Sequence, residues 1–489
     1  MALFSENAAW PSHGFVSQPP TFTVPVFQYN KTGTTDPGNL VLSAGGKTCL
    51  IASDEGELLW RLDDKTPFVT NCLIQKLNGT DVIVYNEAYF TDQNVGFGYG
   101  TVVIRDSTYQ VIHNVTLKDP ELTNSRDGDW ASVIDYHEST LTEEDTVLVV
   151  AYNATQLDLS PFGGPLNGWV HVPLIYELDV KSNDIVYRWD VMENVPLQSS
   201  HAFFGGVHGT GATRDKVWDP YHVNSIQPYK NGFLFSIRNA GTAIYVNKAT
   251  GEIEWTLDGV DRNGDFKIDG DEQTWFNWQH HIRIQDNVHN DRQILTVFNN
   301  FNDEMTGRNE SRGVIIDLDL HTMRGSKRGT FLSPEHPVYA WNSGSVHFDQ
   351  ITNHTIVNYG SGTAVMEFDA DANPIYRLEF GNPVEGYSYR TMRTLWKGYP
   401  KTKPSVRACG KDGELKAYMS WNGASELVKW NVYAGMSAET MDISACLDKT
   451  GFETEAAIPD DSKFIRVDAL DGDDNVLASS STVPTMSTC

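Results

Sequence analysis

The sequence predicts an all-β protein. Short runs of Val, Ile, Phe and Tyr alternate with Gly, Asn and Asp along most of its 489 residues, whereas helical periodicity is nearly absent. Apolar residues make up 40% of the chain, which is enough for one large domain and a small one. No apolar run approaches the roughly 20 residues that a membrane-spanning helix needs. We therefore expect no membrane span.

Six segments share one hairpin pattern, in which an apolar strand, a polar turn and a second strand often end in Trp or Tyr. They lie at 50–60, 102–112, 175–189, 244–255, 313–325 and 364–378. Units repeated at intervals of about 50 to 75 residues predict a six-bladed β-propeller over residues 41–400. A two-sheet sandwich is the alternative, but it does not require the unit six times.

Two further segments flank the predicted propeller. Residues 1–40 are rich in Pro and aromatic residues, and we expect them to wrap the propeller, with an N-terminal strand helping to close the ring. Residues 403–485 predict seven short strands and a buried Trp, which is typical of a small sandwich of the fibronectin III or immunoglobulin kind.

Three inner-strand segments carry a histidine four positions before an apolar residue, at His137, His222 and His280. The first strand of each blade lines the central channel, so equivalent positions converge on one axis. We therefore expect the three side chains to meet in one funnel. A single buried histidine is more often structural, but the other blades carry Thr70 or Gly344 near this position, so the repeat does not demand histidine.

The net charge of -27 is spread along the whole chain, which indicates a solvated acidic surface and argues against a nucleic-acid partner. The five cysteines fall into two close pairs, which predict the disulfides Cys49–Cys72 and Cys409–Cys446 and leave Cys489 unpaired. Sequons for glycosylation stand at Asn30, Asn78, Asn114, Asn153, Asn309 and Asn353. Together these features predict a secreted or secretory-pathway protein. Its first fifteen residues have no apolar core, so we expect a leader that has been removed.

An acidic loop between the third and fourth predicted blades has the spacing of a calcium loop. Its predicted ligands, at positions 1, 3, 5, 7, 9 and 12, are Asp261, Asn263, Asp265, Lys267 through its carbonyl, Asp269 and Glu272. Position 6 is Phe266 where Gly is usual. A structural calcium ion and a solvated acidic turn both remain open. A Gly-rich loop at 199–219, with His201 and His208, either covers the funnel mouth or is a polar connection.

The order and spacing of several motifs resemble one family. They are FVSQPP and PGNLVLSAGG near the start, DYHES at 135–139, HVNS at 222–225, SIRN at 236–239, WQH at 278–280 and YSYRTMRTLW at 387–396. Together with the C-terminal sandwich, they make the chain similar to the arylsulfotransferase-like β-propeller proteins, especially the fungal branch, over roughly residues 15–485.

The resemblance implies transfer of a sulfuryl group between phenols without an organic cofactor. It implies that His280 is the nucleophile, that His222, Asn224 and Arg238 hold the sulfuryl oxygens, and that His137 handles protons or a further oxygen. It also implies a substrate-binding set that comprises Trp278, Asn239, His281, Tyr389 and Arg390. Neutral imidazole can attack sulfur, and Arg and Asn donors offset negative charge on oxygen.

Two other functions fit the same scaffold. One is cofactor-free cyclisation, for example a hetero-Diels–Alder step in fungal meroterpenoid or polyketide metabolism, with the same groups donating hydrogen bonds. The other is a propeller that binds a glycan or protein and has no catalytic activity. Either enzyme would act on an aromatic or phenolic small molecule. The oligomeric state stays open.

Overall fold

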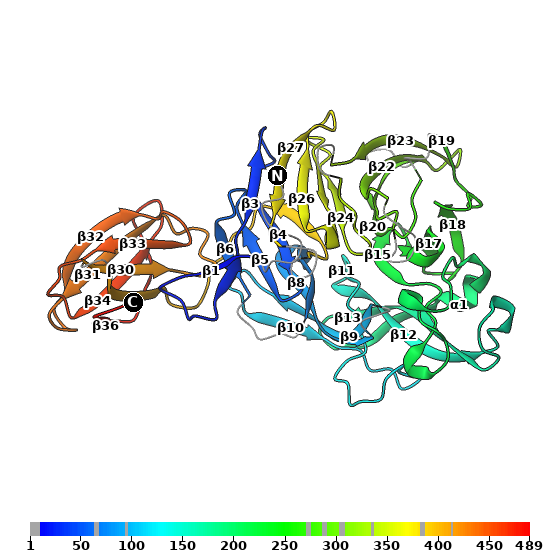
Figure 1. Ribbon diagram of the computed structural model, residues 1–489, viewed down its shortest axis with the longest axis horizontal. Helices are drawn as coiled ribbons and strands as arrows, with labels where there is room; N and C mark the ends of the chain where they lie inside the picture. The colour runs from blue at the N-terminus through cyan, green and yellow to red at the C-terminus, as the bar shows by residue number, and fades with distance from the viewer. Residues whose placement is uncertain are drawn as a thin grey trace.

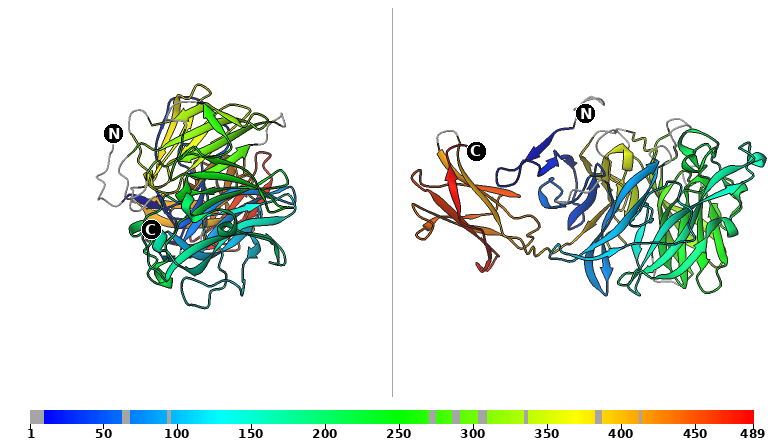
Figure 2. Two further views of the ribbon diagram at one scale, coloured as in Figure 1. Left: turned by 90° about the vertical axis from the view of Figure 1, so that its right-hand side faces the viewer. Right: turned by 90° about the horizontal axis from the view of Figure 1, so that it is seen from below.

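The computed structural model describes residues 10–62, 68–92, 96–269, 275–285, 291–302, 309–333, 337–381, 387–411 and 414–489. Six sheets stand in a ring, and a separate sandwich lies beside it (Figure 1). The predicted all-β fold with a six-bladed propeller is confirmed. Figure 2 shows the sandwich joined to one side of the ring.

The first three blades each consist of four consecutive antiparallel strands. The first comprises β7 (Val69–Leu77), β8 (Thr80–Asp92), β9 (Phe97–Arg105) and β10 (Val111–Val115). The second comprises β11 (Ser139–Leu141), β12 (Thr146–Leu157), β13 (Gly168–Asp179) and β14 (Ile185–Asp190). The third comprises β15 (Val223–Tyr229), β16 (Gly232–Ile237), β17 (Thr242–Asn247) and β18 (Ile253–Asp258).

The fourth and fifth blades each gain an extra outer strand. The fourth comprises β20 (His280–Gln285), β21 (Arg292–Asn299), β22 (Arg312–Asp319) and β23 (Arg324–Phe331), with β19 (Lys267–Asp269) parallel to β23. The fifth comprises β24 (Ser345–Phe348), β25 (Thr355–Asn358), β26 (Ala364–Phe368) and β27 (Pro374–Glu379), with β3 (Gln28–Lys31) outside β27. The predicted hairpins correspond to the third and fourth strands of the blades.

The sixth blade closes the ring by combining strands from distant parts of the chain. Its inner strand is β28 (Thr391–Thr394), and its outer strands are β4 (Asn39–Ala44), β5 (Thr48–Ala52) and β6 (Leu58–Arg61). Thr391 pairs with Leu42 across the junction. The described helical segments are short connections: α1 (Val191–Asn194), η1 (Ser160–Phe162), η2 (Leu197–Ser199), η3 (Gly206–His208), η4 (Arg214–Lys216), η5 (Arg238–Ala240) and η7 (Gly360–Gly362).

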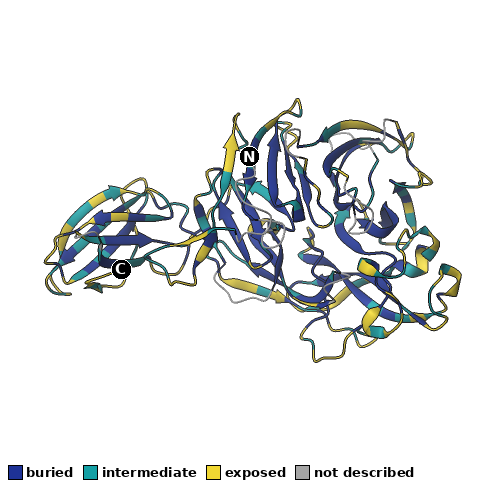
Figure 3. Ribbon diagram, viewed as in Figure 1, coloured by how far each residue is buried: buried dark blue, intermediate teal, exposed yellow. Residues whose placement is uncertain are grey.

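The core of the ring consists of apolar clusters between neighbouring blades. Val102 and Ile104 of the first blade, for example, pack against Val147 and Val149 of the second. A comparable cluster joins each other adjacent pair of blades, including the sixth and the first. Because both faces of a blade are covered, the strands of the ring are mostly buried (Figure 3).

The C-terminal unit has eight strands rather than the seven predicted. They are β29 (Ser405–Lys411), β30 (Glu414–Ser420), β31 (Lys429–Gly435), β32 (Asp442–Asp448), β33 (Glu453–Ala457), β34 (Phe464–Leu470), β35 (Val476–Ser479) and β36 (Val483–Met486). Trp430 lies in its core. The N-terminal hairpin of β1 (Ser12–Gly14) and β2 (Thr23–Pro25) leans on this unit, because the backbone N–H of Ser17 donates to the Glu453 carboxylate at 2.6 Å.

One predicted disulfide is confirmed and one is wrong. Cys49 and Cys72 are bonded, which links the sixth blade to the first. Cys409 bonds to Cys489 and not to Cys446, which is exposed and has a free thiol. The reason is strand order. β36 runs parallel to β29 with Met486 opposite Cys409, so the C-terminal residues pass close to Cys409, whereas β31, β34 and β36 separate β32 from β29 in the sheet order.

The six sequons differ in accessibility. Five asparagines are exposed: Asn30, Asn78, Asn114, Asn309 and Asn353. Asn153 is half-buried, and its side-chain amide donates to Thr155 and accepts from the backbone of Thr123. No helix in the described ranges is long and apolar enough to cross a membrane.

Candidate active site

Three histidines meet where the inner strands of three neighbouring blades begin. His137 lies two residues before β11, His222 directly precedes β15, and His280 opens β20. The ring centroids of His137 and His222 are 4.7 Å apart. The ring of Tyr389, close to the start of β28, lies 5.8 Å from that of His137 and 6.3 Å from that of His280. The structure thus brings together side chains from four blades.

Two of the histidines are oriented by a nearby aspartate. Nδ1 of His222 lies 2.6 Å from Asp219, and Nδ1 of His137 contacts Asp135 in the same way. In both cases the aspartate also accepts the histidine backbone N–H at 3.0 Å. The carboxylate favours the tautomer with a proton on Nδ1, which leaves the lone pair on Nε2. Neither Nε2 has a hydrogen-bond partner in the described part of the chain. Burial, with the neighbouring His137 ring and the Arg238 guanidinium, lowers the pKa of His222 well below its usual value.

His280 is held differently. Its Nδ1 lies 2.7 Å from Oδ1 of Asn300, whose amide nitrogen donates to the carbonyls of Ala340 and Ser343. Nδ1 of His280 therefore carries the proton. Its Nε2 accepts the backbone N–H of Ser343 at 3.2 Å. Burial, with the nearby charge of Arg238, lowers the pKa of His280 well below its usual value, so the ring is neutral at physiological pH.

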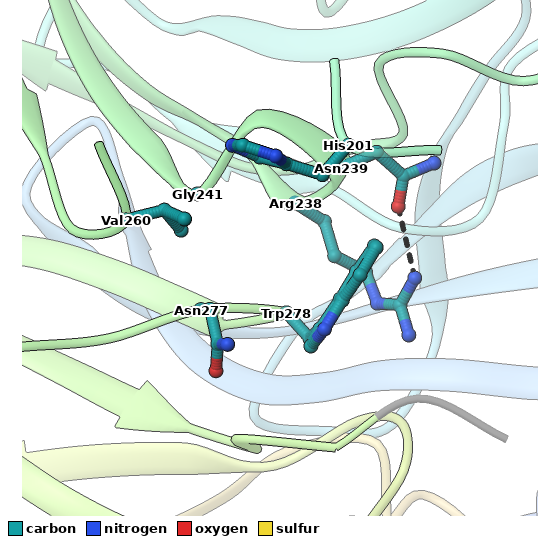
Figure 4. Close-up of a pocket in the computed structure, with 7 residues that line it drawn as sticks. All are labelled: His201, Arg238, Asn239, Gly241, Val260, Asn277 and Trp278. Carbon is teal, nitrogen blue, oxygen red and sulfur yellow. Dashed lines mark hydrogen bonds between the residues drawn. The ribbon is translucent and has the colours of Figure 1, made fainter. Parts of the chain in front are cut away.

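Arg238 lies beside the histidines, in the turn η5 after β16. Its guanidinium donates to Asn239 Oδ1 at 2.9 Å and to the Trp341 carbonyl at 3.2 Å, and it lies over the Trp278 ring at 5.1 Å. Figure 4 shows Arg238 between Asn239 and Trp278. The amide of Asn239 donates to the carbonyl of Asp219 at 2.7 Å, so Asn239 holds the segment that carries the aspartate.

Asn224 is fully buried and holds the backbone next to His280. Its amide nitrogen donates to the carbonyl of Gln279 at 2.7 Å, and its Oδ1 has no partner within the described residues. The Tyr389 hydroxyl donates to the Asn224 carbonyl at 3.4 Å. In this arrangement Asn224 positions the WQH segment, whereas the family resemblance implies a direct contact with the sulfuryl group.

A buried ionic group, which the sequence did not reveal, lies next to the histidines. Glu138 is fully buried and bonds to Arg390 at 2.7 Å and to Arg283 at 2.7 Å. Burial alone would raise the pKa of Glu138, but the two arginines outweigh it and lower the pKa to about 2. Arg390 also donates to the carbonyls of His137 and Asn224, so its guanidinium is engaged by protein and not placed for substrate. In the sequence, the only indication that Glu138 lies near the histidines is that it directly follows His137.

His281 belongs to this inner group and not to the histidine cluster. Its ring lies 4.8 Å from that of His347, and its Nδ1 accepts the backbone N–H of Val346 at 3.4 Å. Burial and the charge of Arg283 lower the pKa of His281 well below its usual value, and burial lowers that of His347 to about 3. The predicted substrate contact of His281 is therefore replaced by packing beside the arginines.

The described carboxylates of the calcium-like loop have separate partners. Asp265 accepts two hydrogen bonds from Thr256, and Asp269 pairs with Arg324. Asp261 faces His201, with Oδ2 3.4 Å from Nε2. These oxygens do not form a group that could hold an ion; in the described ranges such a group is found at Asp36, His354 and Glu367. Glu272 lies outside the described residues, and calcium binding stays a prediction.

The Gly-rich loop at 199–219 packs on the Arg238 side of the site. The His201 backbone donates to the Asn239 carbonyl at 2.7 Å. His208 is buried and stacks on Trp278 with ring centroids 5.2 Å apart. These contacts favour the covering interpretation over that of a polar connection.

Comparisons with known proteins bear on the family and little else. A search of curated proteins finds no match. A protein of unknown function from Bacteroides caccae aligns over 73% of this chain and 98% of its own, with 10% identity and a TM-score of 0.40. Hsv2 of Kluyveromyces lactis aligns over 86% of this chain and 100% of its own, with 10% identity and a TM-score of 0.28. Hydrazine synthase of Kuenenia stuttgartiensis aligns over 75% of this chain and 98% of its own, with 12% identity and a TM-score of 0.31. Similarity at this level carries no argument about the reaction.

A family model described as arylsulfotransferase (ASST) matches residues 73–381, which is more than half of the chain. The matched segment extends from the first blade to just beyond β27, and it contains His137, His222 and His280. The chain therefore belongs to the arylsulfotransferase family.

Proposed function

We propose that this protein is an enzyme that transfers a sulfuryl group from an aryl sulfate to a phenol without an organic cofactor. The observation that supports it best is the meeting of neutral, oriented imidazoles with one guanidinium. His280 offers a nucleophilic nitrogen, His222 a base, and Arg238 a positive charge beside both. Family membership supports the same class of reaction.

In the first half-reaction, Nε2 of His280 attacks sulfur and the bond from sulfur to the aryl oxygen breaks. The phenoxide leaves with the bonding electron pair, and the sulfuryl group is carried on His280. The Nδ1–H of His280 donates to Asn300, which stabilises the positive charge that develops on the ring. When Nε2 attacks, the Ser343 N–H that it accepts becomes free to donate to a sulfuryl oxygen, and Arg238 attracts the negative charge.

In the second half-reaction, an acceptor phenol loses its proton and its oxygen attacks sulfur. Nε2 of His222 takes the proton, and Asp219 stabilises the imidazolium through Nδ1. The bond between sulfur and His280 breaks, which regenerates the neutral ring. His137 with Asp135 is a second base of the same construction.

A second candidate is cofactor-free cyclisation of an aromatic substrate. The observation that favours it is that Nε2 of His280 already accepts the Ser343 N–H, so its lone pair is engaged. His280 would then orient that backbone, while the neighbouring imidazoles and Arg238 bind a substrate oxygen. This reaction forms no covalent enzyme intermediate.

Incubation with 4-nitrophenyl sulfate separates the two candidates. We expect a burst of nitrophenoxide and a mass increase of one SO₃ group on the peptide that contains His280. His280→Ala removes the nucleophile and abolishes both, whereas His321→Ala, at an exposed turn, changes neither. A label that persists in His280→Ala contradicts the assigned nucleophile. If the native chain consumes no aryl sulfate, the cyclase candidate is favoured.

We place the enzyme in the secretory pathway. Two disulfides and five exposed sequons support this location. Mapping of glycopeptides from a secreting eukaryotic host tests this location. We expect glycans on the five exposed asparagines and none on Asn153.

A further inference from the structure

A cavity of about 200 Å³ lies between the third and fourth blades, and Arg238 is part of its lining (Figure 4). Val260 and Gly241 lie on one side of the cavity and the indole of Trp278 lies across from them (Figure 4). His201 also contributes to the lining.

The shape of the cavity is built into the fold. Gly241 has a φ of 65°, and a Cβ at this position would lie 2.3 Å from Cγ2 of Val260, so only glycine fits. Trp278 is held between the Arg238 guanidinium at 5.1 Å and the His208 ring at 5.2 Å. These two sides of the cavity are therefore fixed.

Its size suits a single aromatic ring. An engineered apolar cavity of about 150 Å³ in another protein binds benzene. A cavity of about 200 Å³ accommodates one ring with a small substituent, and the indole of Trp278 offers a partner for offset or edge-on ring packing.

Arg238 links the cavity to the catalytic histidines. This residue lines the cavity, and its charge contributes to the lowered pKa values of both His222 and His280. A ligand oxygen that meets the guanidinium thus lies at the boundary between the cavity and the histidines. Phenols, phenoxides and aryl sulfates present an oxygen of this kind.

We propose that this cavity binds the aryl ring of the substrate, and that the substrate is a monocyclic phenol or its sulfate ester with its oxygen directed at Arg238. The inference rests on the proposed function for the identity of the ligand. Val260 is then the residue that limits the size of the ring.

Calorimetric titration of the full chain with 4-nitrophenol tests this without any turnover. Val260→Phe fills the cavity and should weaken binding about tenfold or more. Val186→Phe makes the same change at an exposed position on β14 and should bind as the native chain does. Equal unfolding temperatures of the variants show that the fold is retained. Native-like binding by Val260→Phe, or no binding by the native chain, overturns the proposal.

His280→Ala distinguishes a failure of this inference from a failure of the proposed reaction. It should bind 4-nitrophenol with native affinity, because the ring site does not include His280. If Val260→Phe loses binding while the native chain transfers no sulfuryl group, the cavity assignment stands and the sulfotransferase proposal fails. If the native chain transfers a sulfuryl group and Val260→Phe retains both binding and transfer, the sulfotransferase proposal stands and the cavity assignment fails.

Discussion

Glu138 balances the positive charge at the centre of the ring. Its two oxygens accept hydrogen bonds from two guanidinium groups, and the backbone N–H of Ile226 and the hydroxyl of Thr140 add to them. A buried charge is tolerated only when partners of this quality compensate for its lost hydration. One carboxylate therefore fixes the inner ends of the second, third, fourth and sixth blades.

Replacing Glu138 by Gln should destabilise the protein by about 3 to 5 kcal/mol, because two buried guanidinium groups lose their counter-charge. Urea unfolding followed by tryptophan fluorescence measures this change. Glu121→Gln is the matched control, since Glu121 pairs with Arg188 at the same 2.7 Å but is 71% exposed. It should change stability by about 1 kcal/mol or less. Equal effects of the two variants would mean that Glu138 carries no special charge balance.

At the residue scale, the sequence predicts the histidines better than their partners. The repeat places His137, His222 and His280 at one position, because blade geometry is periodic. Asp135 and Asp219 precede their histidines by two and three residues, so local spacing could have identified them. The contacts of Arg390 with Glu138 join residues far apart in the chain, and no local pattern reports such a contact.

At the scale of elements, strand order decides which cysteines meet. Cys446 is the nearer partner of Cys409 along the chain, and proximity in sequence favoured it. The parallel alignment of β29 with β36 overrides proximity and places the C-terminal residues beside Cys409. Parallel pairing needs a long connection, so it cannot be inferred from neighbouring residues.

Cys489→Ser should destabilise the sandwich by up to about 4 kcal/mol, because the disulfide closes a loop of 80 residues and restricts the unfolded chain. Differential scanning calorimetry measures the loss. Cys446→Ser removes a free exposed thiol and should leave the transition unchanged. A non-reducing peptide map with a Cys409–Cys446 bond, or a larger loss in Cys446→Ser, would contradict the assignment.

At the scale of the whole molecule, buried neutral histidines tie stability to pH. Among the described residues, burial lowers the pKa of five histidines: His171, His222, His280, His281 and His347. In the folded protein these rings stay neutral below pH 6.5, whereas in the unfolded chain they take up protons there. Below the pKa that a histidine has in the unfolded chain, the unfolded state therefore binds more protons than the folded state. The free energy of unfolding then rises as the pH is raised toward that pKa and decreases as the pH is lowered further below it.

We therefore expect the unfolding temperature to fall as the pH is lowered from about 7.5 to 5.5, since each such histidine contributes up to about 1.4 kcal/mol per pH unit below its unfolded pKa. His171 tests the origin of the effect, because neither ring nitrogen has a partner among the described residues and its pKa is lowered to about 3. His171→Leu should reduce the slope of the pH dependence by the share of one histidine, whereas His321→Leu, at an exposed turn, should leave the slope unchanged. An unfolding temperature that is flat over this range refutes the linkage.

The part of the architecture that consists of local hairpins can be predicted from the sequence. Hairpins are local, so the third and fourth strands of all six blades could be predicted from alternation and turn residues. The pairing of β28 with β4 and of β3 with β27 joins opposite ends of the propeller segment, and only the assembled ring defines it.

The closure of the ring by β28 has a consequence for biosynthesis. Strands β4 to β6 are made early, directly after β3, but their inner partner β28 is the last strand of the propeller to be made. At about 5 to 20 residues per second, β4 waits for tens of seconds with an open edge that can pair with other chains. A nascent chain that stops before Thr391 keeps this edge for good, so any quality control that detects open β-edges would distinguish the unfinished propeller from the finished one.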